Sequence, residues 1–200
     1  MSDFIYLASQ SPRRRQLLEQ IGVRYELLLP DHAEDAESLE AVLPGEAPAA
    51  YVHRVTLAKL EAARARLARR GLPRAPLLCS DTTVALGRKI FGKPADHREA
   101  RAMLTELSGR EHRVITAVAV GTARRAECQV NTSKVRFAEV PAPQIASYVA
   151  SGEPMGKAGA YAIQSQAAAW IERIAGSYSG IMGLPLYETA LLLRRFGVRF

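Results

Sequence analysis

The sequence predicts a mixed α/β fold, and two observations carry the prediction. Helix-like and strand-like patterns alternate irregularly along the 200 residues, and Gly87-Arg88 gives a hairpin signal in the middle of the chain. A strict doubly wound fold alternates regularly, so an α/β or α+β fold with a mixed sheet is favoured. With 48% hydrophobic residues and no internal repeat, the chain suits a single domain over residues 1–200, built as one or two lobes.

The N-terminal segment predicts a strand, a polar turn and a helix. The apolar run Phe4 to Ala8 is typical of a short strand, and Ser11 and Pro12 suit the N-cap and the first position of a helix. Three arginines, 13–15, occupy the first helical turn, where the helix dipole disfavours each cation by up to about 1 kcal/mol. An anion would resolve this misfit, since free N–H groups, the hydroxyls of Ser9 and Ser11 and guanidinium groups together bind phosphates.

A strand at Tyr25 to Leu29 and a long helix from about Ala49 to Arg70 flank an acidic loop. The loop runs from Pro30 to Pro48 and contains Asp31, Glu34, Asp35, Glu37 and Glu40. Lys59 falls on or beside the apolar stripe of the helix, which is an unusual place for a lysine. The cations near the C-terminal end of the helix, where the dipole favours them, are interpreted as a solvated helix end: Arg64, Arg66, Arg69 and Arg70.

The second half of the chain predicts the rest of the sheet. Leu77 to Leu86 is the most apolar strand candidate, although Ser80 and Asp81 interrupt it, and Ile90-Phe91 returns from the hairpin turn. Asp96, with Glu99 three positions later, predicts a capped helix. The further expected elements are strands at Arg113 to Val120, near Cys128 to Phe137 and at Ala168 to Ile174, and helices near Pro143 to Ala150 and at Pro185 to Phe196.

Composition narrows the class of protein. Lys+Arg 27 against Asp+Glu 20 gives a net charge of +7, which suits nucleic acid, nucleotides or an acidic surface without choosing among them. Cys79 and Cys128 form no CxxC pair, so a reducing compartment is expected. The sequence contains neither a signal-peptide pattern nor an apolar run of roughly 18 residues, and a soluble, cytoplasmic protein without membrane contact is expected.

Several residues are candidates for chemistry. A carboxylate inside an apolar strand is costly unless it is paired, so Asp81 is interpreted either as a strand-end residue that caps a turn or as a metal ligand or general base beside a cleft. Lys93, held extended before Pro94, is a candidate phosphate contact. The segment around Lys157 lacks the spacing of a P-loop, and this lysine is kept as a phosphate contact on a loop. Cys79 is expected to pack rather than to act as a nucleophile.

Six spaced motifs cover nearly the whole chain in order: Ser9-Gln-Ser11-Pro12-Arg13-Arg14, Ser80-Asp81-Thr82, Gly92-Lys93-Pro94, Leu107-Ser108-Gly109, Lys157-Ala-Gly-Ala-Tyr161-Ala-Ile-Gln164 and Gly183-Leu184-Pro185-Leu186. Together they resemble the Maf family, whose members are also called septum formation inhibitors and act as nucleoside triphosphate pyrophosphatases. The resemblance implies the fold of the inosine-triphosphate pyrophosphatases, in which two lobes surround a long, twisted mixed sheet flanked by helices and the nucleotide binds in the cleft between them. It also implies a divalent cation, Mg²⁺ or Mn²⁺, hydrolysis between the α- and β-phosphates to a nucleoside monophosphate and pyrophosphate, and a homodimer.

The resemblance also implies roles for individual residues. Asp81 corresponds to the general base and, with Glu34, to the acidic residues that bind the metal. The residues that correspond to the triphosphate contacts are Arg13, Arg14, Lys59 and Lys93.

The base-recognition residues resemble the dTTP/UTP branch of the family. The branch that acts on 7-methyl-GTP has Gln and Glu where this chain has Thr82 and Gln164, and these two residues, with Arg13, are the expected specificity residues. A neutral amide can both donate to and accept from uracil or thymine, whereas a carboxylate only accepts. Ser165-Gln166 follows Gln164 where the family often has glycine, a departure that concerns the shape of the base pocket.

Two other functions stay open. A nucleic-acid-binding or cell-division regulatory protein would explain the net charge of +7 and the arginine-rich segments. No recognised binding module accompanies them, and 6% aromatic residues offer no evident base-stacking platform, so no stable nucleic-acid partner is expected. The other alternative is a pyrophosphatase for purine or modified nucleotides such as 7-methyl-GTP.

Overall fold

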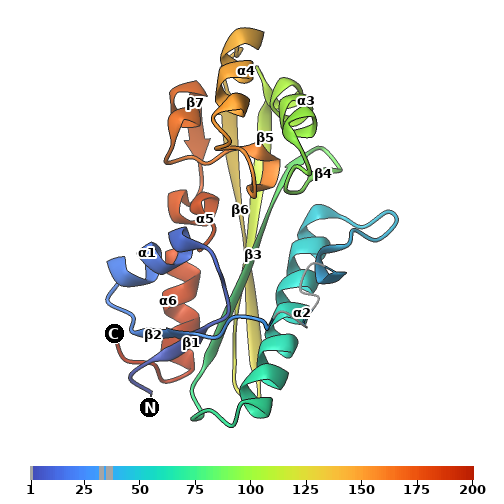
Figure 1. The fold of residues 1–200 in the computed structure, drawn as a ribbon. Helices are drawn as coiled ribbons and strands as arrows, with labels where there is room; N and C mark the ends of the chain where they lie inside the picture. Colours follow the sequence, from blue (N-terminus) through green and yellow to red (C-terminus); the bar gives the residue numbers. More distant parts are fainter. Residues whose placement is uncertain (1, 32–33, 35–37) are drawn as a thin grey trace.

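The computed structural model describes residues 2–31, 34 and 38–200, and seven strands of this part form one mixed sheet (Figure 1). Their bounds are β1 Ile5–Leu7, β2 Tyr25–Leu27, β3 Leu77–Leu86, β4 Lys89–Phe91, β5 Glu111–Gly121, β6 Ala126–Phe137 and β7 Ile171–Ala175. The strands lie in the order β2-β1-β3-β5-β6-β7, with β4 paired to β3. β1 lies parallel to β2 and β3, and the other pairs are antiparallel. The predicted mixed α/β class is therefore confirmed.

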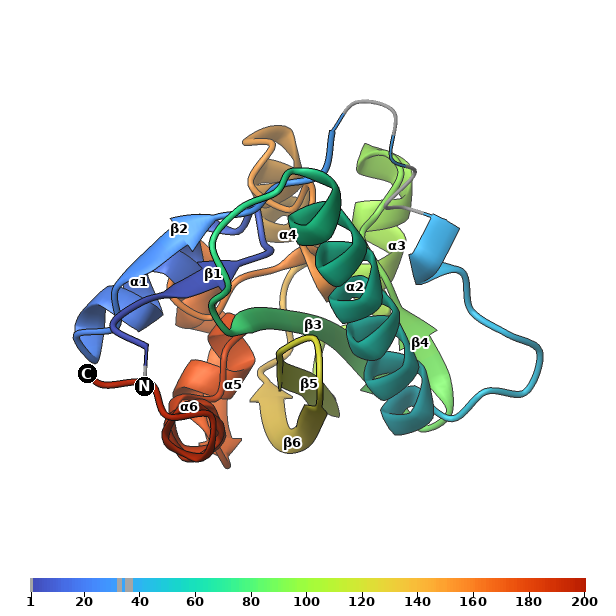
Figure 2. The ribbon, with the colours of Figure 1, turned by 90° about the horizontal axis from the view of Figure 1, so that it is seen from below.

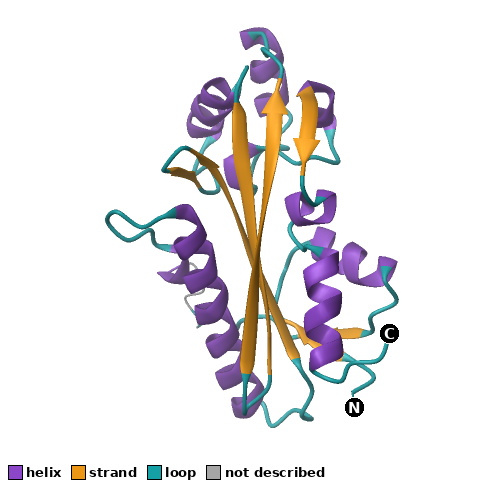
Figure 3. Cartoon of the chain, turned by 180° about the vertical axis from the view of Figure 1, so that it is seen from behind, coloured by secondary structure: helices purple, strands orange, loops and turns teal. Residues whose placement is uncertain are grey.

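Helices cover the two faces of the sheet unequally. One face packs against α2, Pro48–Arg69, which lies along β3 and β5. The opposite face carries α1 (Pro12–Gln20), α5 (Tyr178–Met182) and α6 (Leu186–Arg195) near the chain termini, and α3 (His97–Leu107) and α4 (Ala142–Ala150) at the far end (Figures 1 and 2). The long strands β3, β5 and β6 cross one another as the sheet twists and connect the two ends (Figure 3).

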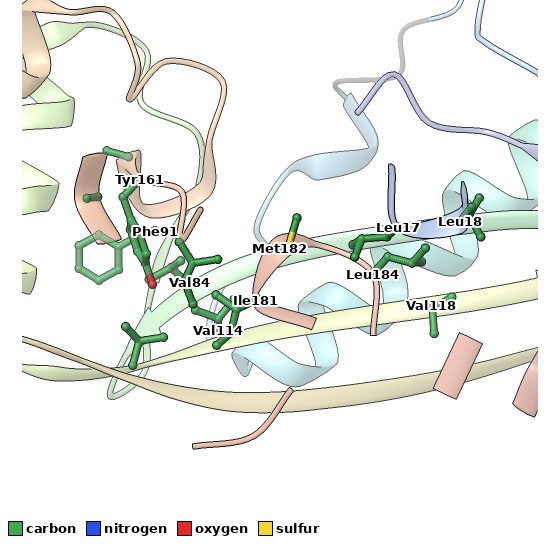
Figure 4. Close-up of a cluster of buried hydrophobic side chains, with 14 of the residues drawn as sticks. Leu17, Leu18, Val84, Phe91, Val114, Val118, Tyr161, Ile181, Met182 and Leu184 are labelled. Atoms are coloured by element: carbon green, nitrogen blue, oxygen red, sulfur yellow. The ribbon is translucent and has the colours of Figure 1, made fainter. Parts of the chain in front are cut away.

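A continuous apolar core lies on the face opposite α2. It runs from α1 past the segment around α5 to β4 and Tyr161, and includes Leu17, Leu18, Ile181, Met182, Leu184, Val84, Phe91 and Tyr161 (Figure 4). Burial of one such side chain contributes roughly 1.5–3 kcal/mol. The core therefore connects both ends of the sheet and fixes α1, the segment around α5 and the segment of Tyr161 in position.

The structure confirms most predicted elements and corrects one. Helix α1 begins at Pro12 with Ser11 as N-cap, and Asp96 caps α3 by accepting a 2.7 Å hydrogen bond from the N–H of Glu99. The predicted strand at Ala168 to Ile174 is wrong in its first half, because residues Gln166–Trp170 form a 3₁₀ helix and β7 begins only at Ile171. Helix α5 is not predicted from the sequence, since five residues are too few to show a helical period.

The acidic loop before α2 contains one short 3₁₀ helix, Ser38–Glu40, among its described residues. Asp35 and Glu37, which the sequence assigns to this loop, lie outside the described residues. In the part of the chain that the structure describes, no helix is both long and apolar enough to cross a membrane.

Candidate active site

A cavity of about 730 Å³ collects every residue that the sequence singled out for substrate, base or metal. Its lining includes Ser9, Ser11, Arg13, Arg14, Glu34, Lys59, Asp81, Thr82, Lys93, Lys157 and Gln164. These residues come from the β1–α1 turn, the acidic loop, α2, β3 and the loops near 93 and 157–164, which are far apart in sequence. A volume of this size is typical of a small-molecule site.

The cavity opens on an unpaired stretch of one edge of β3. On this edge β1 pairs as far as Leu78, and β4 pairs from Val84 onward. No other described strand pairs with β3 on this edge, so residues 79–83 have a free edge, and Ser80, Asp81 and Thr82 of this stretch line the cavity. Asp81 lies at the centre of this stretch, and its position rules out the reading in which it only caps a turn at the end of a strand.

Asp81 belongs to a chain of charged groups on the α2 side of β3. The residue is 7% exposed, and its Oδ1 accepts a 2.6 Å hydrogen bond from Nζ of Lys59 on α2. The same ammonium donates to Oε1 of Glu40 at 2.7 Å, and Oε2 of Glu40 accepts from Lys93 at 2.9 Å. The unusual position of Lys59 on its helix is explained, because the ammonium joins two carboxylates at the cavity.

Residues of β3 on either side of Asp81 point to the opposite face and form a hydrogen-bonded network. The hydroxyl of Thr82 lies 3.0 Å from that of Thr116, which donates to the carbonyl of Gly180 at 2.7 Å. The hydroxyl of Ser80 lies 3.0 Å from the carbonyl oxygen of Gly183. Ser80, Asp81 and Thr82 form a polar triplet in this strand. Because strand side chains alternate, Asp81 points to the side of α2, and Ser80 and Thr82 point to the side of α5.

Arg14 connects three elements through its guanidinium group. Its Nε donates to the carbonyl of Gly183 at 2.8 Å, and its two terminal nitrogens reach the hydroxyls of Ser9 at 3.1 Å and Thr82 at 3.4 Å. Burial lowers the pKa of Arg14 and outweighs the opposite effect of Asp81. These contacts hold the β1–α1 turn against β3 and use three of the five N–H donors of the guanidinium.

Arg13 and Lys157 are the cations best placed for an anion. Nε of Arg13 donates to the carbonyl of Met182 at 3.3 Å, and Lys157 donates to the carbonyl of Glu153. Neither forms an ion pair with a carboxylate of the described residues. Burial lowers the pKa of Arg13, and burial together with the nearby charge of Arg13 lowers the pKa of Lys157. Two partly buried like charges at one cavity favour a bound polyanion.

The segment after Lys157 follows a backbone path that requires glycine at position 159. Gly159 has a φ of +68°, and a Cβ at this position would lie 2.7 Å from Cγ2 of Val84. Its N–H donates to the carbonyl of Gly92 at 3.0 Å, which brings the loop of Lys93 beside it. Ala160, at φ 62°, also adopts the left-handed conformation that is uncommon outside glycine.

The base-recognition prediction concerns the end of this segment. Tyr161 is fixed by a 2.8 Å hydrogen bond with Nε2 of buried His112. Gln164, three residues later, is exposed and lines the cavity, so its amide is available to a ligand. Thr82 lines the same cavity, but its hydroxyl is already engaged with Thr116 and Arg14.

Arg66 corrects the interpretation of the C-terminal end of α2 as solvated. The residue is 4% exposed, and its guanidinium contacts both carboxylate oxygens of Glu34 at 2.6–3.1 Å and the carbonyl of Leu28 at 2.9 Å. These hydrogen bonds lower the pKa of Glu34 to about 2. Arg66 follows Lys59 by seven residues, which places both on one helix face, and this spacing was the available signal.

Among the described residues, the two charged lining residues for which the sequence predicted no role in the site are therefore Arg66 and Glu40. The expectation for Cys79 agrees with the structure, since the residue is fully buried and burial raises the pKa of its thiol to about 12. A thiol with this pKa is not a nucleophile at neutral pH.

Comparisons with known proteins agree with the motifs. A family model described as Maf-like protein matches residues 4–196. The chain is 67% identical over 199 residues to a dTTP/UTP pyrophosphatase of Albidiferax ferrireducens, with 100% of both chains covered. It is 64% identical over 198 residues to a dTTP/UTP pyrophosphatase of a Polaromonas species, with 99% of this chain and 98% of the relative covered. The Ham1 protein of Staphylococcus aureus aligns with 68% of this chain and 72% of its own at 12% identity and a TM-score of 0.41.

Proposed function

Because the chain belongs to the Maf family, we propose that it hydrolyses dTTP and UTP to the nucleoside monophosphate and pyrophosphate. One observation carries the proposal: a single cavity combines the buried carboxylate of Asp81 with cations from four separate segments. The relatives named dTTP/UTP pyrophosphatase, which align over the whole chain, support the choice of substrate.

The phosphate chain would bind among the cations of the cavity. Arg13 and Lys157 lie on the side of the β1–α1 turn, and Lys59 and Lys93 lie on the side of α2. Phosphoryl transfer depends mainly on positioning and on charge stabilisation, which such a set of cations supplies. Arg14 would hold the turn that presents Arg13 through three of its five N–H groups, and the other two would remain for the phosphate contact that the motif predicts.

Asp81 is the group that would orient the attacking water and accept its proton. The carboxylate faces the cavity from the free edge of β3, and the 2.6 Å hydrogen bond from Lys59 fixes one of its oxygens. A buried carboxylate held in one orientation suits a general base.

The donor set also fits a divalent cation, Mg²⁺ or Mn²⁺. These ions are held in nucleotide sites by one or two carboxylates together with phosphate oxygens and water. Asp81 offers such an oxygen, and the described residues contain no cluster of three or more His, Cys, Asp or Glu side chains. Glu34 would join Asp81 only by sharing oxygens that Arg66 already contacts. When bound, the cation neutralises charge on the phosphates.

Base selection would rest mainly on Gln164. Its exposed amide can donate to a carbonyl of uracil or thymine and accept from N3–H. Thr82 would act on selectivity through Arg14 and the packing of the pocket rather than through a free hydroxyl.

Pyrophosphate release across dTTP, UTP, CTP, GTP, 7-methyl-GTP and ITP, with Mg²⁺ or Mn²⁺ and with EDTA, tests the proposal. We expect dTTP and UTP to be preferred and EDTA to abolish turnover. Asp81→Asn should lose at least about 100-fold in kcat with unchanged circular dichroism, whereas Asp3→Asn, at an exposed carboxylate, should behave as wild type. Preference for 7-methyl-GTP, or wild-type turnover of Asp81→Asn, would overturn the assignment.

We also expect a cytoplasmic homodimer without a stable nucleic-acid partner. Light scattering measures the oligomeric state. Filter binding at two salt concentrations tests for a nucleic-acid partner. Tight binding that weakens with salt would contradict this expectation.

A further inference from the structure

Glu40 places a carboxylate between the two lysines on the α2 side of the cavity. Its Oε1 lies 2.7 Å from Nζ of Lys59 and 3.2 Å from Nζ of Lys93, and its Oε2 lies 2.9 Å from Nζ of Lys93. An anionic phosphate that approaches either lysine therefore meets a group of the same charge. The carboxylate occupies the coordination that a phosphate oxygen would use.

The loop that presents Glu40 is tied to α2 at several points. The hydroxyl of Tyr51 donates to the carbonyl of Glu40 at 3.0 Å. Arg54 donates to the carbonyl of Ala41 at 2.8 Å and forms a two-point ion pair with Glu46 at 2.7 Å. The backbone at Glu40 is thus anchored, and a turn of its side chain alone would uncover Lys93 and leave Lys59 with only its contact to Asp81.

We propose that Glu40 is an internal competitor for the phosphate chain, which weakens polyphosphate binding at Lys59 and Lys93 and so speeds release of the pyrophosphate product. The proposal rests on the proposed function, since it assigns both lysines to the phosphate chain. It makes Glu40 an affinity-determining residue rather than a catalytic one.

The exposure of the side chains favours Glu40, and not Asp81, as the carboxylate that moves aside when a phosphate binds the lysines. The side chain of Glu40 is 25% exposed and that of Lys93 is 53% exposed, whereas that of Asp81 is 10% exposed. A carboxylate at the mouth of the cavity can turn into water at little cost, while a buried one cannot. Burial raises the pKa of Glu40, but the charges of Lys59 and Lys93 outweigh it and hold the pKa below its ordinary value. Glu40 is therefore ionised at neutral pH.

Glu40→Gln tests the proposal, because it keeps the shape and removes the charge. Calorimetry with inorganic pyrophosphate and with tripolyphosphate measures binding without turnover. We expect both dissociation constants to fall about two- to fivefold, the size of a partly exposed charge contact, with stronger product inhibition by pyrophosphate and a lower KM for dTTP. The control is Glu61→Gln, which removes one charge from the exposed face of α2 and should change none of these values.

A double-variant cycle locates the effect. In a Lys93→Met background, Glu40→Gln should gain less affinity for pyrophosphate than it does in the wild type.

Three results would overturn the proposal. An unchanged or weaker affinity for pyrophosphate in Glu40→Gln would show that the carboxylate does not compete. A fall in kcat without a gain in pyrophosphate affinity would make Glu40 a positioning residue for Lys59. A higher metal requirement would make it a metal ligand. Because pyrophosphate binding is measured directly, these results are distinct from failure of the proposed function, which would appear as absence of dTTP and UTP hydrolysis in the wild type.

Discussion

Replacement of Arg66 by methionine isolates the energy of the buried guanidinium at the end of α2. Methionine keeps an apolar stem but removes the bonds to Glu34 at 2.6–3.1 Å and to the carbonyl of Leu28 at 2.9 Å. An orphaned buried carbonyl costs about 1–3 kcal/mol. The ion pair adds about 1–2 kcal/mol, because the Glu34 side chain is still 21% exposed. We expect a loss of about 3 kcal/mol in the free energy of unfolding, or about 6–12 °C in Tm for a chain of this length.

Calorimetric melting at neutral pH measures this loss against a matched control. Arg69 contacts the same carboxylate at 2.6 Å from an exposed position, so Arg69→Met should cost less than about 1 kcal/mol. If Arg66→Met melts within 2 °C of Arg69→Met, taking 2 °C as roughly the effect of half a kilocalorie per mole, the reasoning is refuted.

The pH dependence of the same variant follows from the lowered pKa of Glu34. The folded protein holds this pKa at about 2, against an ordinary value of 4.5. The unfolded chain therefore binds the proton more readily, and the pair stabilises the fold fully above about pH 4.5 and progressively less as the pH falls toward 2. The difference in stability between wild type and Arg66→Met should shrink over that range.

Three further predictions concern the cleft and the core. Arg14→Lys should lower Tm and reduce kcat/KM for dTTP at least about tenfold, since an ammonium cannot replace a fork that joins three elements; wild-type values in melting and kinetics would contradict this. Burial lowers the pKa of His112 to about 4, so the wild type should lose roughly 3 kcal/mol of stability as the pH falls from about 6.5 to 4. Denaturant titrations across this pH range should show a smaller loss of stability in His112→Gln than in the wild type. The control His53→Gln, at an exposed histidine, should lose as much stability as the wild type. Gln164→Glu should lower kcat/KM for UTP about tenfold or more at unchanged Tm, and an unaltered ratio of UTP to GTP turnover would count against the base assignment.

Much of the fold and of the site could be predicted from local pattern. The long helix α2 shows an apolar stripe with the helical period, and β3 is an apolar run that only a few polar residues interrupt. The capping pair at Asp96 indicates the start of α3. The helices of five residues at Gln166–Trp170 and Tyr178–Met182 carry no period and exist through tertiary contacts. The roles of Arg66 and Glu40 could not be predicted from local pattern either, because they depend on contacts that are distant in the chain. Arg66 binds a partner 32 residues away, and Glu40 binds partners 19 and 53 residues away.

The polar triplet in the otherwise apolar strand β3 is explained by the way its neighbours pair. β1 runs parallel to β3 and leaves it after Leu78, whereas β4 is antiparallel and joins at Val84. Between these two strands the edge of β3 has no strand partner among the described residues, and the cavity lies beside it instead of another strand. The polar side chains of this stretch therefore line the cavity. Alternation then divides the triplet, with Asp81 on the side of Lys59 and with Ser80 and Thr82 on the side of Arg14. A carboxylate that would be costly in a continuous sheet is thereby both paired and accessible, which is the condition that a buried general base must meet.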